Sequence, residues 1–239
     1  PAWICLAGLL AIVAISYWPG RNGGYTFDDY PNIVDNTALH VVHPTWNDWI
    51  AATMSSPSKD TPRPLAMLSF AINHSFTGLD PQPMKLTNIA VHVINTLLVF
   101  FLVRSLLRAV APGVPARDSR HEWIALFTAG CWGLHPINLM AVLYIVQRME
   151  SLCHAFVFAG LWMYVVGRMR QREGRRGWGL ILCGVIGGTA FGTRGDYTRT
   201  VVGTLVVIVL GQVMTGWGFD PADQNILYGA LIILVVSLY

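Results

Sequence analysis

The sequence has little charge. Only 12% of its 239 residues are Asp, Glu, Lys or Arg, about half the share that soluble domains carry. Apolar residues make up 54%, and nearly uncharged stretches of about 15 to 24 residues recur along the chain. A helix of about 20 residues is long enough to cross the bilayer core. The composition therefore predicts an integral membrane protein with several transmembrane helices.

Cysteine is absent from the long polar segment near the N-terminus, where a disulfide framework would form. All four cysteines fall inside apolar stretches, at Cys5, Cys131, Cys153 and Cys183. Cysteines in such places usually act as small buried hydrophobic residues. We therefore expect no disulfide framework.

Other absences narrow the function. The sequence has no glycine loop for a phosphate, no metal-ligand spacing among His and Cys, and no serine-nucleophile elbow. No acid lies centrally in an apolar stretch, which counts against a transporter. The formal net charge is only +3, and the basic residues lie in short loops between apolar runs, so we expect no nucleic-acid partner.

The apolar stretches predict an all-α polytopic fold of about seven transmembrane helices, at 2–18, 86–108, 122–139, 151–168, 177–193, 200–217 and 225–239. Arginines concentrate in the loops at about 109–121 and 169–176 and at their edges, and such loops face the cytoplasm. The first loop, 19–84, is then extracytoplasmic. We expect residues 1–239 to form one transmembrane module from the N-terminal part of a longer chain, in a bacterial inner membrane.

The first loop contains two further helical patterns. Thr45 followed by Asp48 is a helix-start signal, and a second apolar face follows Pro64. Amphipathic helices beside a membrane usually lie in its interface, so we expect two membrane-parallel helices here. The alternative is ordinary packing of loop helices on one another.

Three sets of polar residues are candidates for chemistry. Asp28 and Asp29 are adjacent near the membrane, and repulsion between two carboxylates raises one pKa so that one acid serves as a base; a solvated turn is the alternative. Asn88, His92 and Asn95 share one helix face and suit helix-to-helix hydrogen bonds or a site. Outer arginines suit a phosphate, or anchor the helices at the interface.

The motifs occur in an order that resembles a known family. The series is Phe27-Asp28-Asp29, Asn32, Asn36, Arg63-Pro64-Leu65, Asn88 with His92 and Asn95, His135-Pro136, and Val146-Gln147-Arg148 with Glu150. Over about residues 26–166 it resembles the tetratricopeptide-repeat-containing transmembrane O-mannosyltransferases and their bacterial relatives. These are similar in architecture to other membrane glycosyltransferases of the GT-C class.

The resemblance implies a glycosyltransferase that moves a sugar from a polyprenyl-phosphate donor to a hydroxyl of a protein or glycan at the outer face. The resemblance implies that Asp28 and Asp29 act on the acceptor hydroxyl. The donor phosphate would be bound by Arg63, Arg148 and Arg194, and the pocket would be shaped by His92, His135 and Glu150. The implied partners are membrane lipid, the lipid-linked sugar and the acceptor, with a divalent cation and additional membrane subunits as further options.

The chain departs from the family at one turn. Relatives carry a Ser-Lys-Glu-like sequence between the fifth and sixth helices, where this chain reads Thr193-Arg194-Gly195-Asp196-Tyr197. Two other functions therefore stay open: a non-catalytic membrane subunit on the same scaffold, and a lipid or solute transporter.

Overall fold

The computed structural model describes residues 2–41, 45–57, 63–110 and 119–186, which are helical and contain no strand. Its long helices are α1 (Ala2–Tyr17), α4 (Pro81–Val110), α5 (Ser119–Gly133) and α7 (Arg148–Arg172), followed by α8 (Trp178–Ile186). The helices predicted at 200–217 and 225–239 and the end of the one at 177–193 lie outside the described residues, as do Arg194 and Asp196.

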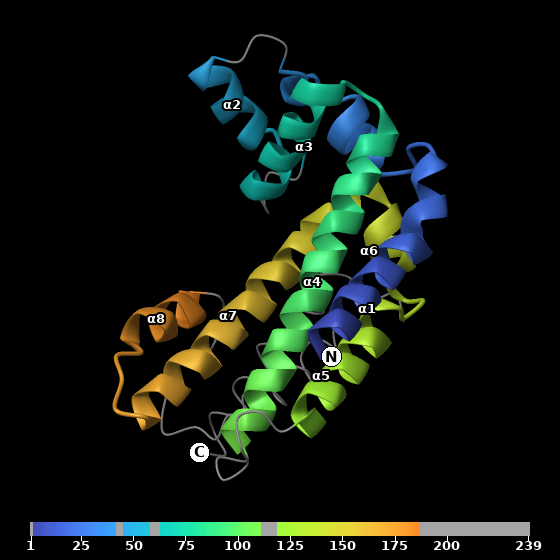
Figure 1. The fold of residues 1–239 in the computed structure, drawn as a ribbon. Helices are drawn as coiled ribbons and strands as arrows, with labels where there is room; N and C mark the ends of the chain where they lie inside the picture. Colours follow the sequence, from blue (N-terminus) through green and yellow to red (C-terminus); the bar gives the residue numbers. More distant parts are fainter. Residues whose placement is uncertain (1, 42–44, 58–62, 111–118, 187–239) are drawn as a thin grey trace, which may run out of the picture. The chain divides into compact units, whose positions relative to one another are not determined.

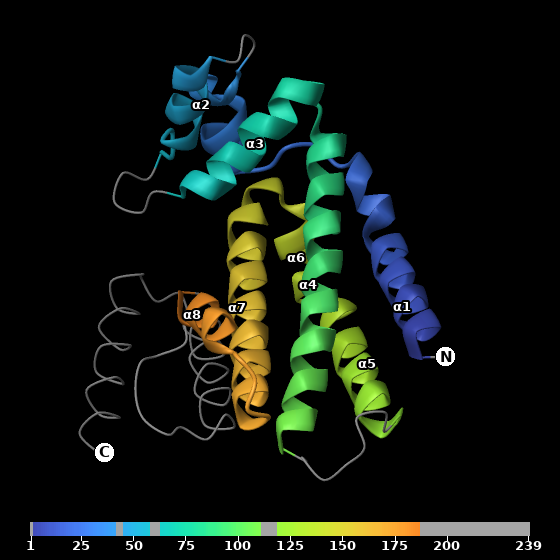
Figure 2. The same ribbon diagram turned by 60° about the vertical axis from the view of Figure 1, so that its left-hand side comes forward.

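Three helical stretches in the described ranges are long and apolar enough to cross a membrane: Ala2–Asn22, Pro81–Val110 and Ile145–Arg172. They confirm a membrane protein with an all-helical fold. In Figures 1 and 2, α4 lies between α7 on one side and α1 with α5 on the other. The buried residues Leu6, Val99, Phe100, Ala125 and Ala129 pack together from α1, α4 and α5.

The described residues between α1 and α4, at 23–41, 45–57 and 63–77, form a second packed region that we call the cap. It contains a π-helical turn η2 (Tyr30–Val34), a 3₁₀ turn η3 (Thr37–Leu39), α2 (Trp46–Thr53) and α3 (Pro64–Thr77). Its core is built mainly from apolar residues of these elements and includes one residue each from α4 and the turn before α7. The cap lies at the end of the bundle where α4 begins (Figures 1 and 2).

Local sequence explains where the cap helices begin and end. Thr45 and Asp48 form a capping box at the start of α2, in which each side chain binds the other residue's backbone N–H,. α3 begins at Pro64, where a missing N–H costs nothing. It ends before Gly78, whose φ of 64° suits glycine,. The orientation of α2 and α3 to a membrane stays a prediction.

One predicted boundary is wrong. The sequence predicted a single helix over 122–139, but α5 ends at Gly133 and a short helix, α6 (Asn138–Leu143), follows. His135-Pro136 explains the break, because proline disfavours helical geometry in the residue before it. A 3₁₀ turn, η4 (Ile145–Gln147), then leads into α7. The chain therefore folds back at this end of the bundle and reaches the base of the cap.

Candidate functional site

The two acids occupy different environments at the base of the cap. Asp29 is 1% exposed, and its carboxylate accepts hydrogen bonds from the backbone N–H of Val146 (2.7 Å) and of Thr26 (3.0 Å). Asp28 is exposed, and its backbone N–H donates to the hydroxyl of Tyr144 at 2.7 Å. One acid is therefore built into the structure, while its neighbour meets solvent.

The pKa of the Asp29 carboxyl is raised above its usual range, chiefly because burial disfavours the charged form,. The hydrogen bonds from Thr26 and Val146 and the positive charge of Lys85 oppose this shift. The sequence predicted a raised pKa from repulsion between the two acids. Burial is the main cause in the structure, and the acid it affects is Asp29.

The backbone beside the acids is strained. Phe27 has a φ of 38°, a conformation that is costly for a bulky residue. Its side chain is 83% exposed, so no burial of the ring compensates for this cost. Strain of this kind concentrates at functional sites, and here it turns the chain so that Asp28 and Asp29 both reach the turn before α7.

Two tyrosines lie near the acids. Burial, with smaller contributions from Asp29 and Asp80, raises the pKa of Tyr25 to about 12. Burial also raises the pKa of Tyr144, and the charges of Asp28 and Asp29 add to the shift. Both phenols therefore keep their protons at neutral pH. The hydroxyl of Tyr25 donates to the sulfur of Met84 at 3.4 Å, and the hydroxyl of Tyr144 accepts the N–H of Asp28.

Arg148 lies at the start of α7 and is fully buried. Its guanidinium donates to the side chains of Asn88 (2.7 Å) and Asn73 (2.6 Å) and to the backbone oxygen of Met84 (2.8 Å). It also donates to Ser69 and stacks 4.6 Å from the centre of the Phe70 ring. Arg148 thus joins α3, α4 and α7, and the donor-phosphate role stays a prediction for a side chain whose donors are largely engaged.

Lys85 is a candidate site residue that the sequence did not point to. It is 5% exposed on α4, and among the described residues its ammonium group has no hydrogen-bond acceptor or ion-pair partner within bonding distance. Its positive charge favours the ionised form of the Asp29 carboxyl and so lowers the pKa of that group. A Cβ at Gly23 would lie 2.7 Å from the Lys85 nitrogen, so glycine leaves room for it there. The available signal was that Lys85 is the only Lys or Arg between Arg63 and Arg104.

The other predicted site residues lie in three places. Arg63 precedes α3 and contacts the sulfur of Met149 at 3.0 Å, next to Arg148 and Glu150 in the first turn of α7. His92 is buried between helices, where its ring bonds the oxygen of Gly133 at 2.9 Å and stacks on Trp132. His135 is exposed, and its ring accepts from the N–H of Ile137. Arg194 lies outside the described residues.

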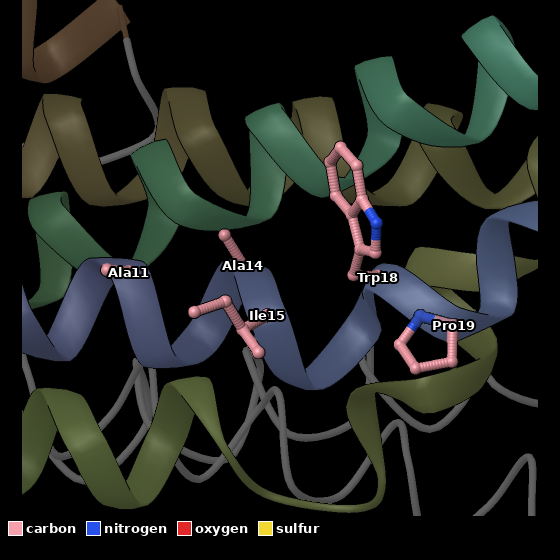
Figure 3. Close-up of a pocket in the computed structure, with 5 residues that line it drawn as sticks. All are labelled: Ala11, Ala14, Ile15, Trp18 and Pro19. Atoms are coloured by element: carbon pink, nitrogen blue, oxygen red, sulfur yellow. The ribbon is translucent and has the colours of Figure 1, made fainter.

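In the described ranges no group of three or more His, Cys, Asp and Glu residues is placed to hold a metal ion. An open apolar groove runs along α1 into the 3₁₀ turn η1 (Trp18–Asn22), lined by Ala11, Ala14, Ile15, Trp18 and Pro19 (Figure 3). The guanidinium of Arg21 lies 4.4 Å from the centre of the Trp18 ring. The groove therefore ends close in sequence to Gly23.

Comparison with known proteins adds to this geometry. The chain is 30% identical to mouse "Protein O-mannosyl-transferase TMTC3" over 161 residues, which are 65% of this chain and 16% of the relative. It is similar in sequence to the TMTC proteins. The Drosophila melanogaster Tmtc1 protein is 28% identical over 227 residues, covering 92% of this chain and 24% of the relative. Human TMTC4 is 28% identical over 235 residues, covering 89% of this chain and 31% of the relative.

These comparisons confirm the resemblance that the ordered motifs predicted. The chain spans less than a third of each of these three relatives. No protein-family model matches the chain, and no solved structure matches it.

Proposed function

We propose that this chain is part of a membrane glycosyltransferase that transfers a sugar from a polyprenyl-phosphate donor to a protein hydroxyl at the outer membrane face. The observation that carries the proposal is the acid pair: one carboxylate is anchored and its neighbour is exposed, with a buried lysine charge nearby. The names of the TMTC relatives specify protein O-mannosyl transfer, so a mannosyl donor is the first to test.

Asp28 suits the acceptor side of the reaction. It is the exposed acid, and Tyr144 fixes its backbone. The acceptor oxygen forms a bond to the anomeric carbon of the sugar while the bond from that carbon to the donor phosphate breaks. The carboxylate of Asp28 takes the hydroxyl proton, and the bonding electrons leave with the phosphate. General-base assistance of this kind contributes roughly 10²- to 10⁴-fold.

Lys85 suits the donor side. The leaving phosphate gains negative charge, and a cation with no other partner stabilises that charge best in surroundings of low dielectric constant. Lys85 has these properties and lies by Gly23, just beyond η1. The apolar groove that runs from α1 into η1 suits the first part of the donor's lipid chain. Donor lipid and donor phosphate would then lie along one continuous stretch.

The distribution of charge supports the outer location. The acids lie at the end of the bundle where the cap lies, whereas α4 ends, α5 begins and α7 ends at the opposite end (Figures 1 and 2). That opposite end contains Arg108, Arg120 and the arginines that follow Gly167. Arginine-rich ends face the cytoplasm. The polar residues of α4 also favour an enzyme over a transporter, because Asn88, His92 and Asn95 bond backbone oxygens of neighbouring segments.

The test is sugar transfer by the whole protein that contains this chain, reconstituted with a polyprenyl-phosphate mannose donor. Asp28→Asn is expected to lower kcat at least about 100-fold, and Lys85→Met is expected to raise KM for the donor. Asp35→Asn is the matched control, because Asp35 is an exposed acid in the same loop. Folded Asp28→Asn protein that transfers sugar at the rate of the Asp35→Asn control would overturn the proposal.

A further inference from the structure

A single turn contacts both acids. We propose that the Tyr144–Val146 turn is an acid clamp that fixes the positions of Asp28 and Asp29 for sugar transfer, and that Asn88 and Arg148 hold this turn in place. The inference rests on the function proposed above and gives Arg148 a positioning role, in which it acts through Asn88.

The clamp holds the acids at two points. The hydroxyl of Tyr144 accepts the backbone N–H of Asp28 at 2.7 Å, and the backbone N–H of Val146 donates to the carboxylate of Asp29 at 2.7 Å. These contacts join residues 116 and 117 positions apart in the chain. With its backbone and its neighbour both held, Asp28 keeps an exposed carboxylate at a defined place. Such preorganisation matters because small displacements of a catalytic group slow catalysis.

Asn88 holds the clamp from the side of α4. Its amide nitrogen donates to the backbone oxygens of Tyr144 (3.3 Å) and Ile145 (3.2 Å), while its side-chain oxygen accepts from Nε of Arg148 at 2.7 Å. A guanidinium has only donors, so Arg148 requires the oxygen of the Asn88 amide to face it. The NH₂ group of that amide then points at the two oxygens of the turn. Arg148 thereby determines which end of Asn88 reaches the clamp.

Arg148 is itself fixed by the rest of the structure. Its remaining donors bond Asn73 and Ser69 on α3 and the backbone oxygen of Met84 on α4. The position of the acids therefore depends on how the cap is seated on the bundle. Arg148 is fully buried, and its Nε and both of its terminal nitrogens already donate to protein oxygens, which favours a positioning role over contact with the donor phosphate.

Two variants separate positioning from donor binding. Tyr144→Phe removes only the oxygen that accepts the Asp28 N–H. Asn88→Asp keeps the acceptor for Arg148, now as an ion pair, but cannot donate to the oxygens of Tyr144 and Ile145. In both variants we expect kcat to fall roughly 10- to 100-fold, with KM for the donor unchanged within about twofold. Residues that bound the donor directly would instead raise KM.

Hydrogen exchange tests the clamp without any transfer assay. Tyr144→Phe is expected to speed exchange of the Asp28 amide about tenfold, as for the loss of one hydrogen bond. Asn88→Asp is expected to speed exchange of the amides of both Asp28 and Val146. Asn95→Asp is the matched control on the same helix: Asn95 bonds the backbone oxygen of Ser151, so its loss lowers the melting temperature without changing exchange at the acids.

The outcomes distinguish the clamp from the function it serves. If the native protein transfers no sugar, the proposed function fails, and exchange at Asp28 still decides whether the clamp exists. Unchanged exchange of the Asp28 amide in folded Tyr144→Phe protein would overturn the clamp. So would an exchange pattern in Asn88→Asp that matches Asn95→Asp. If Asn88→Asp does not fold, Tyr144→Phe alone gives the decision.

Discussion

The cap and the transmembrane bundle are both all-helical, yet different forces hold them together. In the cap, residues such as Ile33, Met67 and Phe70 are buried in a shared core, and burial from water stabilises them. In the bundle, Leu6 and Phe100 pack between helices, but lipid is as apolar as these side chains, so packing itself supplies the stability.

The site lies where these two regions meet. The cap contributes Asp28 and Asp29, α4 contributes Lys85 and Asn88, and the turn before α7 contributes Tyr144. Polar groups are costly inside either region, and at the junction Asp29, Asn88 and Arg148 form hydrogen bonds with their surroundings. Because different forces stabilise the two regions, we expect substitutions in the cap and in the bundle to differ in their effects on stability. Four predictions test this difference.

The largest expected effect comes from Phe70→Ala in the cap. Phe70 is 0% exposed and lies under the guanidinium of Arg148, so its loss should cost about 3–5 kcal/mol of unfolding free energy. Phe100→Ala in the bundle, at 1% exposure, should cost less because lipid replaces water as the reference. Denaturation of the two variants in mixed detergent compares the costs. Equal losses would contradict the distinction between the two regions.

Arg148→Gln should have the next largest effect. The shorter glutamine amide cannot donate to the side-chain oxygens of both Asn88 and Asn73, and one unsatisfied buried acceptor costs about 1–3 kcal/mol. Arg170→Gln is the control, since Arg170 is exposed on the same helix, and should change stability by less than about 0.5 kcal/mol. Thermal unfolding in detergent measures both. A stable Arg148→Gln protein would show that the junction does not depend on this network.

Gly133→Ala should disturb the bundle but not the cap. A Cβ there would lie 2.8 Å from Oγ1 of Thr96 and 3.1 Å from Val13, and overpacking of this kind costs roughly 1–3 kcal/mol. Gly8→Ala is the matched control on α1, because nothing lies within 4 Å of its added Cβ. Hydrogen exchange should rise in α1, α4 and α5 and stay constant in α2 and α3. Faster exchange in the cap would mean that the regions are more strongly coupled.

The smallest expected effect is a pH dependence of the cap. Burial, and to a smaller extent the charge of His40, lower the pKa of His74 below 6.5, and the two rings are stacked with centroids 4.5 Å apart. As pH falls through about 6.5 the unfolded cap binds a proton before the folded cap does, so stability should decrease toward acid. His74→Gln should flatten this dependence, measured as cap hydrogen exchange at several pH values. If the pH dependence of cap stability were the same in His74→Gln, groups other than His74 would be responsible for it.

The sequence predicted the class of the protein more readily than the arrangement around Asp28 and Asp29. Long apolar runs predict transmembrane helices directly. A helix start such as Thr45 with Asp48 is also predictable, because its capping bonds join residues only three positions apart. The end of α5 was missed because the break at His135-Pro136 competes with an apolar pattern that continues past it.

Long-range contacts explain the remaining differences. Arg148 looked like an exposed phosphate ligand because its sequence neighbours are polar, and only the fold shows that residues of α3 and α4 surround it. Tyr144 lies in an apolar run that gives no functional signal. Lys85 was not singled out in the sequence, and only the fold places it near Asp29, which lies more than 50 positions earlier in the chain.

The central claim is that the acids of the cap and the turn before α7 meet at one membrane surface. Cysteines introduced as Asp28→Cys and Tyr144→Cys, in a background without the native cysteines, test it in intact membranes. We expect a short bifunctional thiol reagent to join them and an impermeant reagent to reach residue 28 only from the non-cytoplasmic side. Failure to join them, or labelling of residue 28 from the cytoplasm, would contradict it.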